Sequence, residues 1–287
     1  MNHYPSNVKE KLNSIILSMA EHHWLFSKNP GHDFTRQHLG KLSFYDTMRL
    51  IISMGKGSTN DEIMDYFNLD PDLIPSQSAF CQRRRQISLS AFEYLFSEFS
   101  SSFPSTTDKF KDHCILACDG CHVVYATNSD IIEDYNKPRL IDYKGYNHMH
   151  LNGFVDVISK AFLDVVIQPG QQPDEREALH SMLDHFTPDD PQKYIITADR
   201  GYESYDLLFH CELKNLGYVF RVKSPSSPKS ILSYYASEFP DDLEEFDVTI
   251  KRFFTDKATN IMKSQSDVYR YINPSKNTPH FYELLRK

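Results

Sequence analysis

The first 112 residues carry apolar side chains at the three- to four-residue spacing that is typical of amphipathic helices. The residues that follow this spacing most clearly are Leu12, Ile15, Ile16, Met19, Phe44, Met48, Ile51 and Ile52. A further helix is predicted to begin at Thr59, because Thr59 and Glu62 have the spacing of a capping box. We therefore expect residues 1–112 to form a helical region.

Two of the predicted helices are separated by the segment LDPDLIP, and the second of them ends in Arg83, Arg84 and Arg85. Two short helices joined by a turn are typical of a helix-turn-helix DNA-binding motif, although this connector is longer than the usual one. The pattern supports two interpretations. The arginines contact DNA phosphates, or they form the solvated face of a plain helix bundle.

From His113 onward the pattern changes to short β-rich segments, followed by helices that alternate with strands. The expected order is three β segments, a helix near DEREALHSMLDHF, the strand YIITA, a helix with Gly217 as its C-terminal capping residue, and the strand YVFRVK. Such an order predicts a mixed sheet with helices packed on it over residues 113–223. Residues 224–287 carry only weak strand signals and are expected to form a partial β-rich insertion.

Composition and charge narrow the class of protein. Of the 287 residues, 40% are apolar and 24% are charged, which is typical of a globular protein. No apolar run is long enough to span a membrane, and the first residues lack a secretory signal, so we expect a cytoplasmic protein without a membrane partner. The net charge is −8, but residues 130–190 are acidic and residues 251–287 are basic. Such a chain can bind metal in one region and phosphate in another.

Three of the five cysteines lie close together, at Cys114, Cys118 and Cys121. A structural zinc site needs a second, distant pair of ligands, and only Cys211 lies far from this cluster on the C-terminal side. A strand over this segment would also direct the three side chains to both of its faces. The sequence favours free thiols over a zinc site.

Two aspartates stand at or near the ends of apolar runs that are expected to be buried strands. Asp119 follows ILAC, and Asp199 follows YIITA. Polar residues at strand ends commonly form the sites of sheets with helices on their faces. Two neighbouring carboxylates repel one another, and a divalent cation such as Mg²⁺ turns this repulsion into binding. Simpler interpretations remain: Asp119 and Gly120 could form a hairpin turn, and Asp199 could pair with Arg200.

Several segments resemble the insertion-sequence transposases of the DDE superfamily that carry an Asp-Arg-Gly-Tyr signature. The segments are FTRQHLGKLSF, PSQSAFCQRRRQI, ACDG at 117–120, DER at 174–176 and, above all, ITADRGYESYDLLFHCELKNLGYVFRVK at 196–223. The resemblance implies a ribonuclease-H-like core in which Asp119 and Asp199 are catalytic acids and metal ligands. It further implies Mg²⁺ or Mn²⁺ as cofactor, two ions in a complete enzyme, and double-stranded DNA as partner, bound by a homodimer. The candidate DNA-binding residues are Arg83, Arg84, Arg85 and Arg200.

The sequence departs from this family at the third catalytic acid, a Glu within the motif Tyr-x2-Arg-x3-Glu-x6-Lys. Tyr218 and Arg221 have the correct spacing, but Pro225 occupies the Glu position, and Glu283 lacks the spacing. The chain is therefore interpreted as the front part of a transposase, and we expect it to lack strand-transfer activity alone. The alternatives are a catalytically inactive DNA-binding fragment with an inhibitory role and a metal-dependent nuclease outside transposition.

Overall fold

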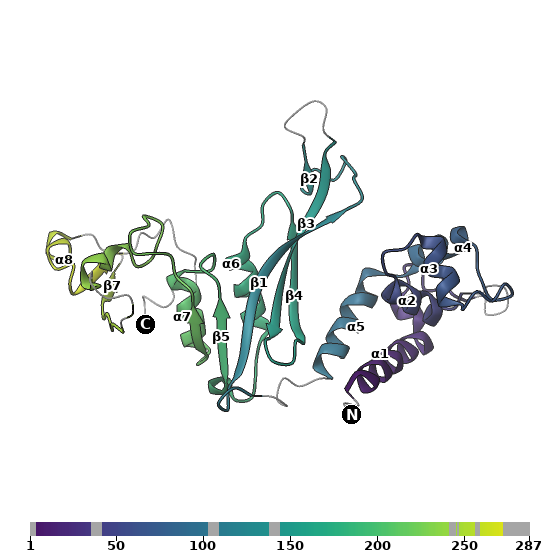
Figure 1. Ribbon diagram of the computed structural model, residues 1–287, viewed down its shortest axis with the longest axis horizontal. Helices are drawn as coiled ribbons and strands as arrows, with labels where there is room; N and C mark the ends of the chain where they lie inside the picture. The colour runs from purple at the N-terminus through teal and green to yellow at the C-terminus, as the bar shows by residue number, and fades with distance from the viewer. Residues whose placement is uncertain are drawn as a thin grey trace. The chain divides into compact units, whose positions relative to one another are not determined.

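The computed structural model describes residues 4–35, 42–102, 109–137, 144–240, 245, 247–255 and 259–271. The chain divides into two compact units, Met1–Pro104 and Ser105–Lys287 (Figure 1). The finer boundaries expected from the sequence, after residues 112 and 223, stay predictions.

The N-terminal unit is helical. Its elements are α1 (Tyr4–Glu21), the 3-10 helix η1 (His23–Phe26), α2 (Phe44–Ser53), α3 (Thr59–Tyr66), α4 (Gln77–Gln86) and α5 (Leu89–Ser101). One apolar core joins α1, α2 and α5, and Ile16, Met48 and Ala91 are fully buried in it. A second, smaller core joins α2, α3 and α4 around Phe80.

One local expectation for this unit was wrong. The N-cap of α3 is Ser58, whose hydroxyl accepts a hydrogen bond from the Asp61 backbone N–H at 3.2 Å. Glu62 instead accepts a hydrogen bond from the Gly57 N–H at 2.7 Å. On α2, Leu50 is fully buried while Ile52 is 39% exposed. Leu50 is buried because α2 packs against α4 as well as against α1. A helix with two packing partners buries a wider part of its surface than a helix with one.

The second unit is built on a six-stranded mixed sheet. Its elements up to the last strand of this sheet are β1 (Cys114–Tyr125), β2 (Tyr135–Asn136), β3 (Tyr146–Asp156), β4 (Phe162–Pro169), α6 (Glu175–His185), the 3-10 helix η2 (Pro191–Lys193), β5 (Tyr194–Ala198), α7 (Tyr205–Leu213) and β6 (Gly217–Phe220). The central strand β1 is antiparallel to β3 and parallel to β5. β3 continues antiparallel to β4, and β5 continues parallel to β6.

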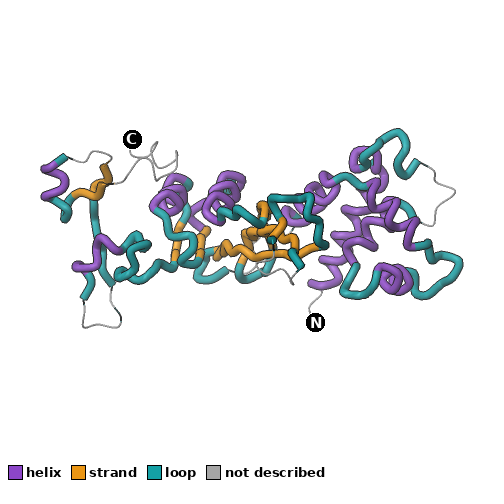
Figure 2. The backbone as a smooth tube through the Cα atoms, turned by 90° about the horizontal axis from the view of Figure 1, so that it is seen from above, coloured by secondary structure: helices purple, strands orange, loops and turns teal. Residues whose placement is uncertain are grey.

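This arrangement confirms the predicted fold class, a helical N-terminal region followed by a mixed sheet with flanking helices, and it is consistent with a ribonuclease-H-like core. α6 and α7 lie side by side on one face of the sheet (Figure 2). Leu179, Met182 and Leu183 from α6 pack with Leu116 and Ile196 from the sheet in one fully buried core.

Two sequence interpretations of turns were wrong. Asp119 and Gly120 do not form a hairpin turn, because they lie within β1 and pair with Gly153 and Asn152 of β3. The long partner strand keeps β1 extended through the Asp-Gly pair. At the end of α7, Asn215 takes the left-handed backbone conformation, with φ 56°. Gly217 is therefore not the residue that ends the helix and begins β6 instead.

The remaining elements of the second unit are short. They are the 3-10 helix η3 (Ser233–Glu238), β7 (Phe253–Thr255), α8 (Asn260–Ser264) and β8 (Tyr269–Tyr271). β7 and β8 form a separate two-stranded parallel sheet. Among the residues that the structure describes, no helix combines the length and apolarity needed to cross a membrane.

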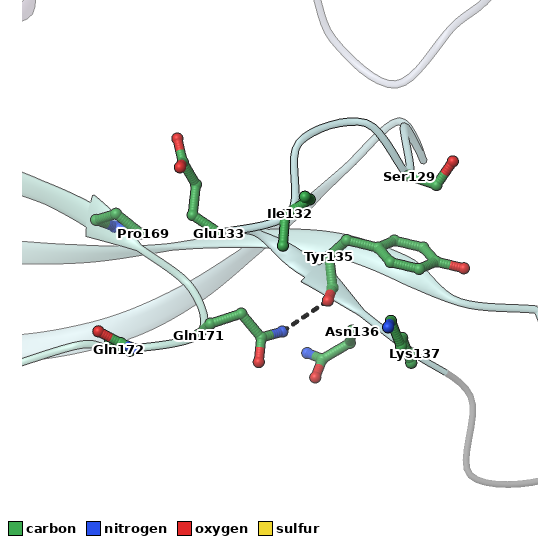
Figure 3. A pocket seen from close by; sticks show the side chains of 9 residues that line it. All are labelled: Ser129, Ile132, Glu133, Tyr135, Asn136, Lys137, Pro169, Gln171 and Gln172. Atoms are coloured by element: carbon green, nitrogen blue, oxygen red, sulfur yellow. Dashed lines mark hydrogen bonds between the residues drawn. The ribbon is translucent and has the colours of Figure 1, made fainter.

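A hollow of about 1030 Å³ lies beside β2 (Figure 3). It is lined by Ser129, Ile132, Glu133, Tyr135, Asn136, Lys137, Pro169, Gln171 and Gln172. The Gln171 side chain donates a hydrogen bond to the Tyr135 carbonyl across it at 2.9 Å. None of the candidate site residues lines this hollow.

Candidate active site

Two residues that pair between neighbouring strands are each followed in the sequence by one of the candidate acids. Cys118 on β1 pairs with Ala198 on β5 in parallel register, and Asp119 and Asp199 are the next residues on each strand. Strands paired in parallel run in the same direction, so the two aspartates stand side by side although 80 positions separate them in the sequence. Both are exposed. An exposed position suits a substrate too large to enter a pocket.

Each aspartate is oriented by a backbone N–H of a glycine. The Gly120 N–H donates to Asp119 Oδ1 at 2.9 Å, and the Gly201 N–H donates to Asp199 Oδ1 at 2.6 Å. Hydrogen bonds to a carboxylate from backbone donors are charge-assisted and directional. They leave the second oxygen of each carboxylate available for another ligand.

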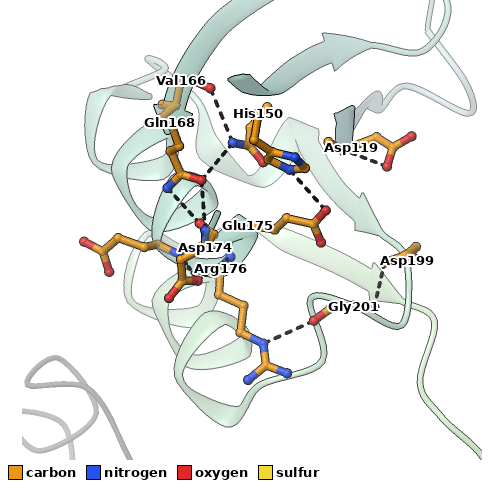
Figure 4. Close-up of polar contacts among 12 residues, drawn as sticks. Asp119, His150, Val166, Gln168, Asp174, Glu175, Arg176, Asp199 and Gly201 are labelled. Atoms are coloured by element: carbon orange, nitrogen blue, oxygen red, sulfur yellow. Dashed lines mark hydrogen bonds and ion pairs between the residues drawn. The ribbon is translucent and has the colours of Figure 1, made fainter. Parts of the chain in front are cut away.

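The loop that carries Asp199 is held from two directions. From α6, Arg176 Nε donates to the Gly201 carbonyl at 3.1 Å (Figure 4). After β6, Lys223 Nζ donates to the Arg200 carbonyl at 2.9 Å and contacts Glu203 Oε1 at 3.2 Å. Glu203 is buried, and it also accepts a hydrogen bond from the Lys223 backbone N–H. These contacts fix the loop without using the Asp199 carboxylate.

The layer beneath the aspartates is apolar and electrically neutral. Tyr202 and Cys118 are both buried. Burial raises the pKa of the Cys118 thiol to about 12, and it also raises the pKa of the Tyr202 phenol. Both groups therefore stay protonated at neutral pH, and the negative charge of the site lies on the exposed carboxylates.

Glu175 is a third acid at this site that the sequence interpretation did not assign. It is the first residue of α6, and its carboxylate extends toward the strand ends that carry Asp119 and Asp199 (Figure 4). Glu175 Oε1 lies 3.3 Å from Nε2 of the buried His150 on β3. The segment DER could have indicated Glu175 as a site residue. It resembles the family's sequence, and it contains a residue type that binds metal.

The chemistry of these donors fits a divalent cation of the Mg²⁺ class, which prefers carboxylate oxygens and retains several waters. Within the described ranges, no three His, Cys, Asp and Glu side chains are grouped closely enough to form a ready-made metal cage. Asp119 and Asp199 would be the first residues to hold such an ion. The cysteines of β1 form no disulfide; Cys114 and Cys118 are buried, and Cys121 is exposed on the other side of the strand.

The candidate DNA-binding arginines differ in their surroundings. Arg83 packs over the Phe34 ring, 5.2 Å from its centroid, and donates to Gln86 Oε1 at 3.1 Å. Arg84 and Arg85 are exposed near the end of α4, and the Arg84 guanidinium lies over the Phe80 ring, 5.8 Å from its centroid. The connector between α3 and α4 runs over residues 67–76, longer than the turn of a helix-turn-helix motif. Arg200 is exposed beside Asp199.

The third-acid motif remains without a match among the described residues. Pro225, at the position where the motif requires Glu, lies in a loop beyond β6. Glu283, the other residue considered for this role, lies outside the described residues.

Comparison with protein families finds one match. Residues 110–283 match a family described as "Transposase DDE domain". The matched segment covers more than half of the chain and includes the whole six-stranded sheet with Asp119, Glu175 and Asp199. No curated protein matches the chain.

Proposed function

The chain belongs to the transposase DDE domain family, and on this premise we propose that it acts on the ends of an insertion sequence. The proposed reaction is metal-dependent cleavage of DNA and transfer of the freed strand end to a target, and of these two steps we expect this chain alone to lack the transfer. The observation that carries the proposal is the register of β1 and β5, which brings Asp119 and Asp199 side by side. Acting on cellular DNA, the protein would work in the cytoplasm.

In this proposal Asp119 and Asp199 hold Mg²⁺ or Mn²⁺, with two ions in the complete site. Bound divalent ions would activate the attacking oxygen and stabilise the leaving oxygen of a phosphodiester. The protein's own part is to keep the two carboxylates in place. Arg176 and Lys223 serve this purpose through the Gly201 and Arg200 carbonyls. The exposed Arg200 guanidinium is suited to a phosphate next to the reacting one.

We assign DNA binding to the helical N-terminal unit, with a homodimer as the assembly on DNA. The overall charge of −8 opposes non-specific binding, so affinity must come from local basic groups. Arg84 and Arg85 are exposed and adjacent, whereas Arg83 is engaged with Phe34. Arg84 and Arg85 are therefore the stronger candidates for phosphate contacts.

The test is cleavage of a 5′-labelled duplex that carries the DNA bordering this coding sequence, incubated with the protein and Mn²⁺. We expect a nick at the element end that disappears in Asp119→Asn and in Asp199→Asn. Asp190→Asn is the matched control, because Asp190 is an exposed acid of the same unit that pairs with Lys193 at the surface. Its cleavage should equal that of the unchanged protein.

Two results would contradict the proposal. Cleavage that survives both Asp119→Asn and Asp199→Asn would move the active site elsewhere. Tight binding of the duplex without cleavage in Mn²⁺ or Mg²⁺ would favour the alternative of a DNA-binding module with an inhibitory role.

A further inference from the structure

We propose that Glu175 supplies a third carboxylate to the cation site of Asp119 and Asp199. This inference rests on the proposed function, because it concerns the same site. It differs from the motif-based expectation, which places the third acid in a later helix. Here the acid comes from the first residue of α6, the helix that packs across β1, β3 and β4.

The two oxygens of Glu175 approach the two glycines that orient the aspartates. Glu175 Oε1 lies 2.9 Å from the point where a Cβ would stand on Gly120, and Oε2 lies 3.1 Å from the equivalent point on Gly201. The same two glycines donate their N–H groups to Asp119 and Asp199. One carboxylate thus lies beside both glycines, and at Gly201 it faces Asp199.

Glu175 lies close to Asp199 beside the second of these glycines, Gly201. Asp199 Oδ1 lies 2.9 Å from the Cβ point of Gly201, and Glu175 Oε2 lies 3.1 Å from the same point. The two oxygens are separated by no more than the sum of these distances. No side chain occupies the space between them, because residue 201 is glycine.

The start of α6 is locked to the sheet, which fixes the position of Glu175. The Asp174 side chain caps the helix by accepting from the Arg176 and Glu177 N–H groups, both at 3.1 Å. Gln168 on β4 then ties Asp174 to the sheet. Its Oε1 accepts from the Asp174 N–H at 3.0 Å and from Asn152 Nδ2 at 3.2 Å (Figure 4).

A buried polar atom without a hydrogen-bond partner provides an independent indication of a ligand here. Asn152 is 0% exposed, and its Oδ1 makes no hydrogen bond. This atom lies 3.0 Å from the Cβ point of Gly120, beside Glu175 Oε1 and beside His150 Nε2, which contacts Glu175. Buried polar atoms usually have a partner, often an ordered water or an ion. A hydrated cation held by Glu175 would supply a water to Asn152 Oδ1.

Among the described residues, the three carboxylates do not yet meet at one point. For one ion to bind all three, their side chains must rotate toward one another, and between Glu175 and Asp199 the glycine at position 201 places no side chain in the way. A divalent cation supplies the attraction that overcomes the mutual repulsion of three acids.

The experiment measures binding of Mn²⁺ alone, without DNA, by electron paramagnetic resonance of the free ion during titration of the full chain. Glu175→Gln keeps the shape of the side chain and removes its charge. We expect it to weaken Mn²⁺ binding about tenfold or more, on the order of the loss seen when groups that support a metal site are removed. Glu177→Gln is the matched control, because Glu177 is an exposed acid two positions along the same helix.

The possible outcomes separate this inference from the proposed function. If Mn²⁺ binds, and Asp119→Asn weakens it while Glu175→Gln leaves it unchanged, Glu175 is not a ligand and the two-aspartate site stands. If the unchanged protein does not bind Mn²⁺ at all, both proposals fail. A loss of binding in Glu175→Gln counts in favour only if Glu177→Gln binds normally and both variants unfold at the temperature of the unchanged protein.

Discussion

Burial separates the cysteines of the second unit into two chemical classes. Cys118 and Cys211 are buried, and burial raises the pKa of each thiol from its usual 9.0 to about 12. Cys121, three positions beyond Cys118 on the same strand, is exposed. The thiolate is the reactive form of cysteine. Cys118 and Cys211 are therefore protected in two ways, because reagents do not reach them and because their thiols stay protonated.

We predict that iodoacetamide at pH 8 modifies Cys121 in the folded protein and leaves Cys118 and Cys211 unmodified. All three should react in urea, and peptide mass spectrometry distinguishes them. Modification of Cys118 at the rate of Cys121 in the folded chain would show that the layer beneath Asp119 is open to solvent.

The same pKa values predict a loss of stability in alkali. The unfolded chain has thiols of ordinary pKa, so the stabilisation is complete below pH 9 and declines as pH rises toward the folded value of about 12. Urea unfolding of the unchanged protein should therefore show a fall in free energy above pH 9. In Cys118→Ala and Cys211→Ala together this fall should be smaller. An identical fall in the double variant would assign it to other groups.

At the scale of elements, α6 and α7 are joined by a chain of polar groups within their apolar contact. His180 Nδ1 lies 2.8 Å from His210 Nδ1, His180 Nε2 lies 2.9 Å from Asp206 Oδ2, and His210 Nε2 lies 3.1 Å from Asp184 Oδ1. Of the two Nδ1 atoms, one donates and the other accepts, and each Nε2 faces a carboxylate. The buried Asp206 thus pairs with the buried His180.

Removal of Asp206 should consequently cost more stability than removal of an exposed acid. We expect Asp206→Ala to lower the free energy of unfolding by about 3–5 kcal/mol, as for other buried ion pairs that lose one partner. Asp190→Ala breaks an exposed pair with Lys193 and should change little. Equal changes in the free energy of unfolding for Asp206→Ala and Asp190→Ala, measured in urea, would mean that the polar chain between α6 and α7 does not stabilise the fold.

The end of α4 carries the electrostatic part of the proposed DNA binding. If Arg84 and Arg85 contact phosphates, replacing both with Ala should weaken duplex binding and flatten its salt dependence, by roughly one unit of slope for each lost contact. Lys9→Ala with Lys11→Ala changes the charge of the same unit equally, on exposed positions of α1. The two double variants should differ in slope, and identical slopes would leave Arg84 and Arg85 as a solvated face.

At the scale of the whole molecule, the sequence predicts the order of elements and the two strand ends, and tertiary pairing decides the rest. Asp199 follows a short apolar run that is typical of a buried strand, so its place at the site could be predicted from the sequence. Asp119 was ambiguous, since Asp-Gly favours a turn and only the pairing with β3 keeps β1 extended. Glu175 reaches the site because Gln168 ties the start of α6 to the sheet, a contact between residues of different elements. No local pattern contains that information.

The central claim is that Asp119, within β1, and Asp199, directly after β5, jointly hold a divalent cation. Anomalous X-ray scattering from crystals of the protein soaked in MnCl₂ tests it most directly, because it locates the ion itself. We predict an anomalous peak within about 2.0–2.4 Å of an oxygen of each aspartate, the range of Mg²⁺- and Ca²⁺-like ligand distances, and its loss in Asp199→Asn. A Mn²⁺ peak bound elsewhere, with none between the two aspartates, would contradict the assignment of this active site.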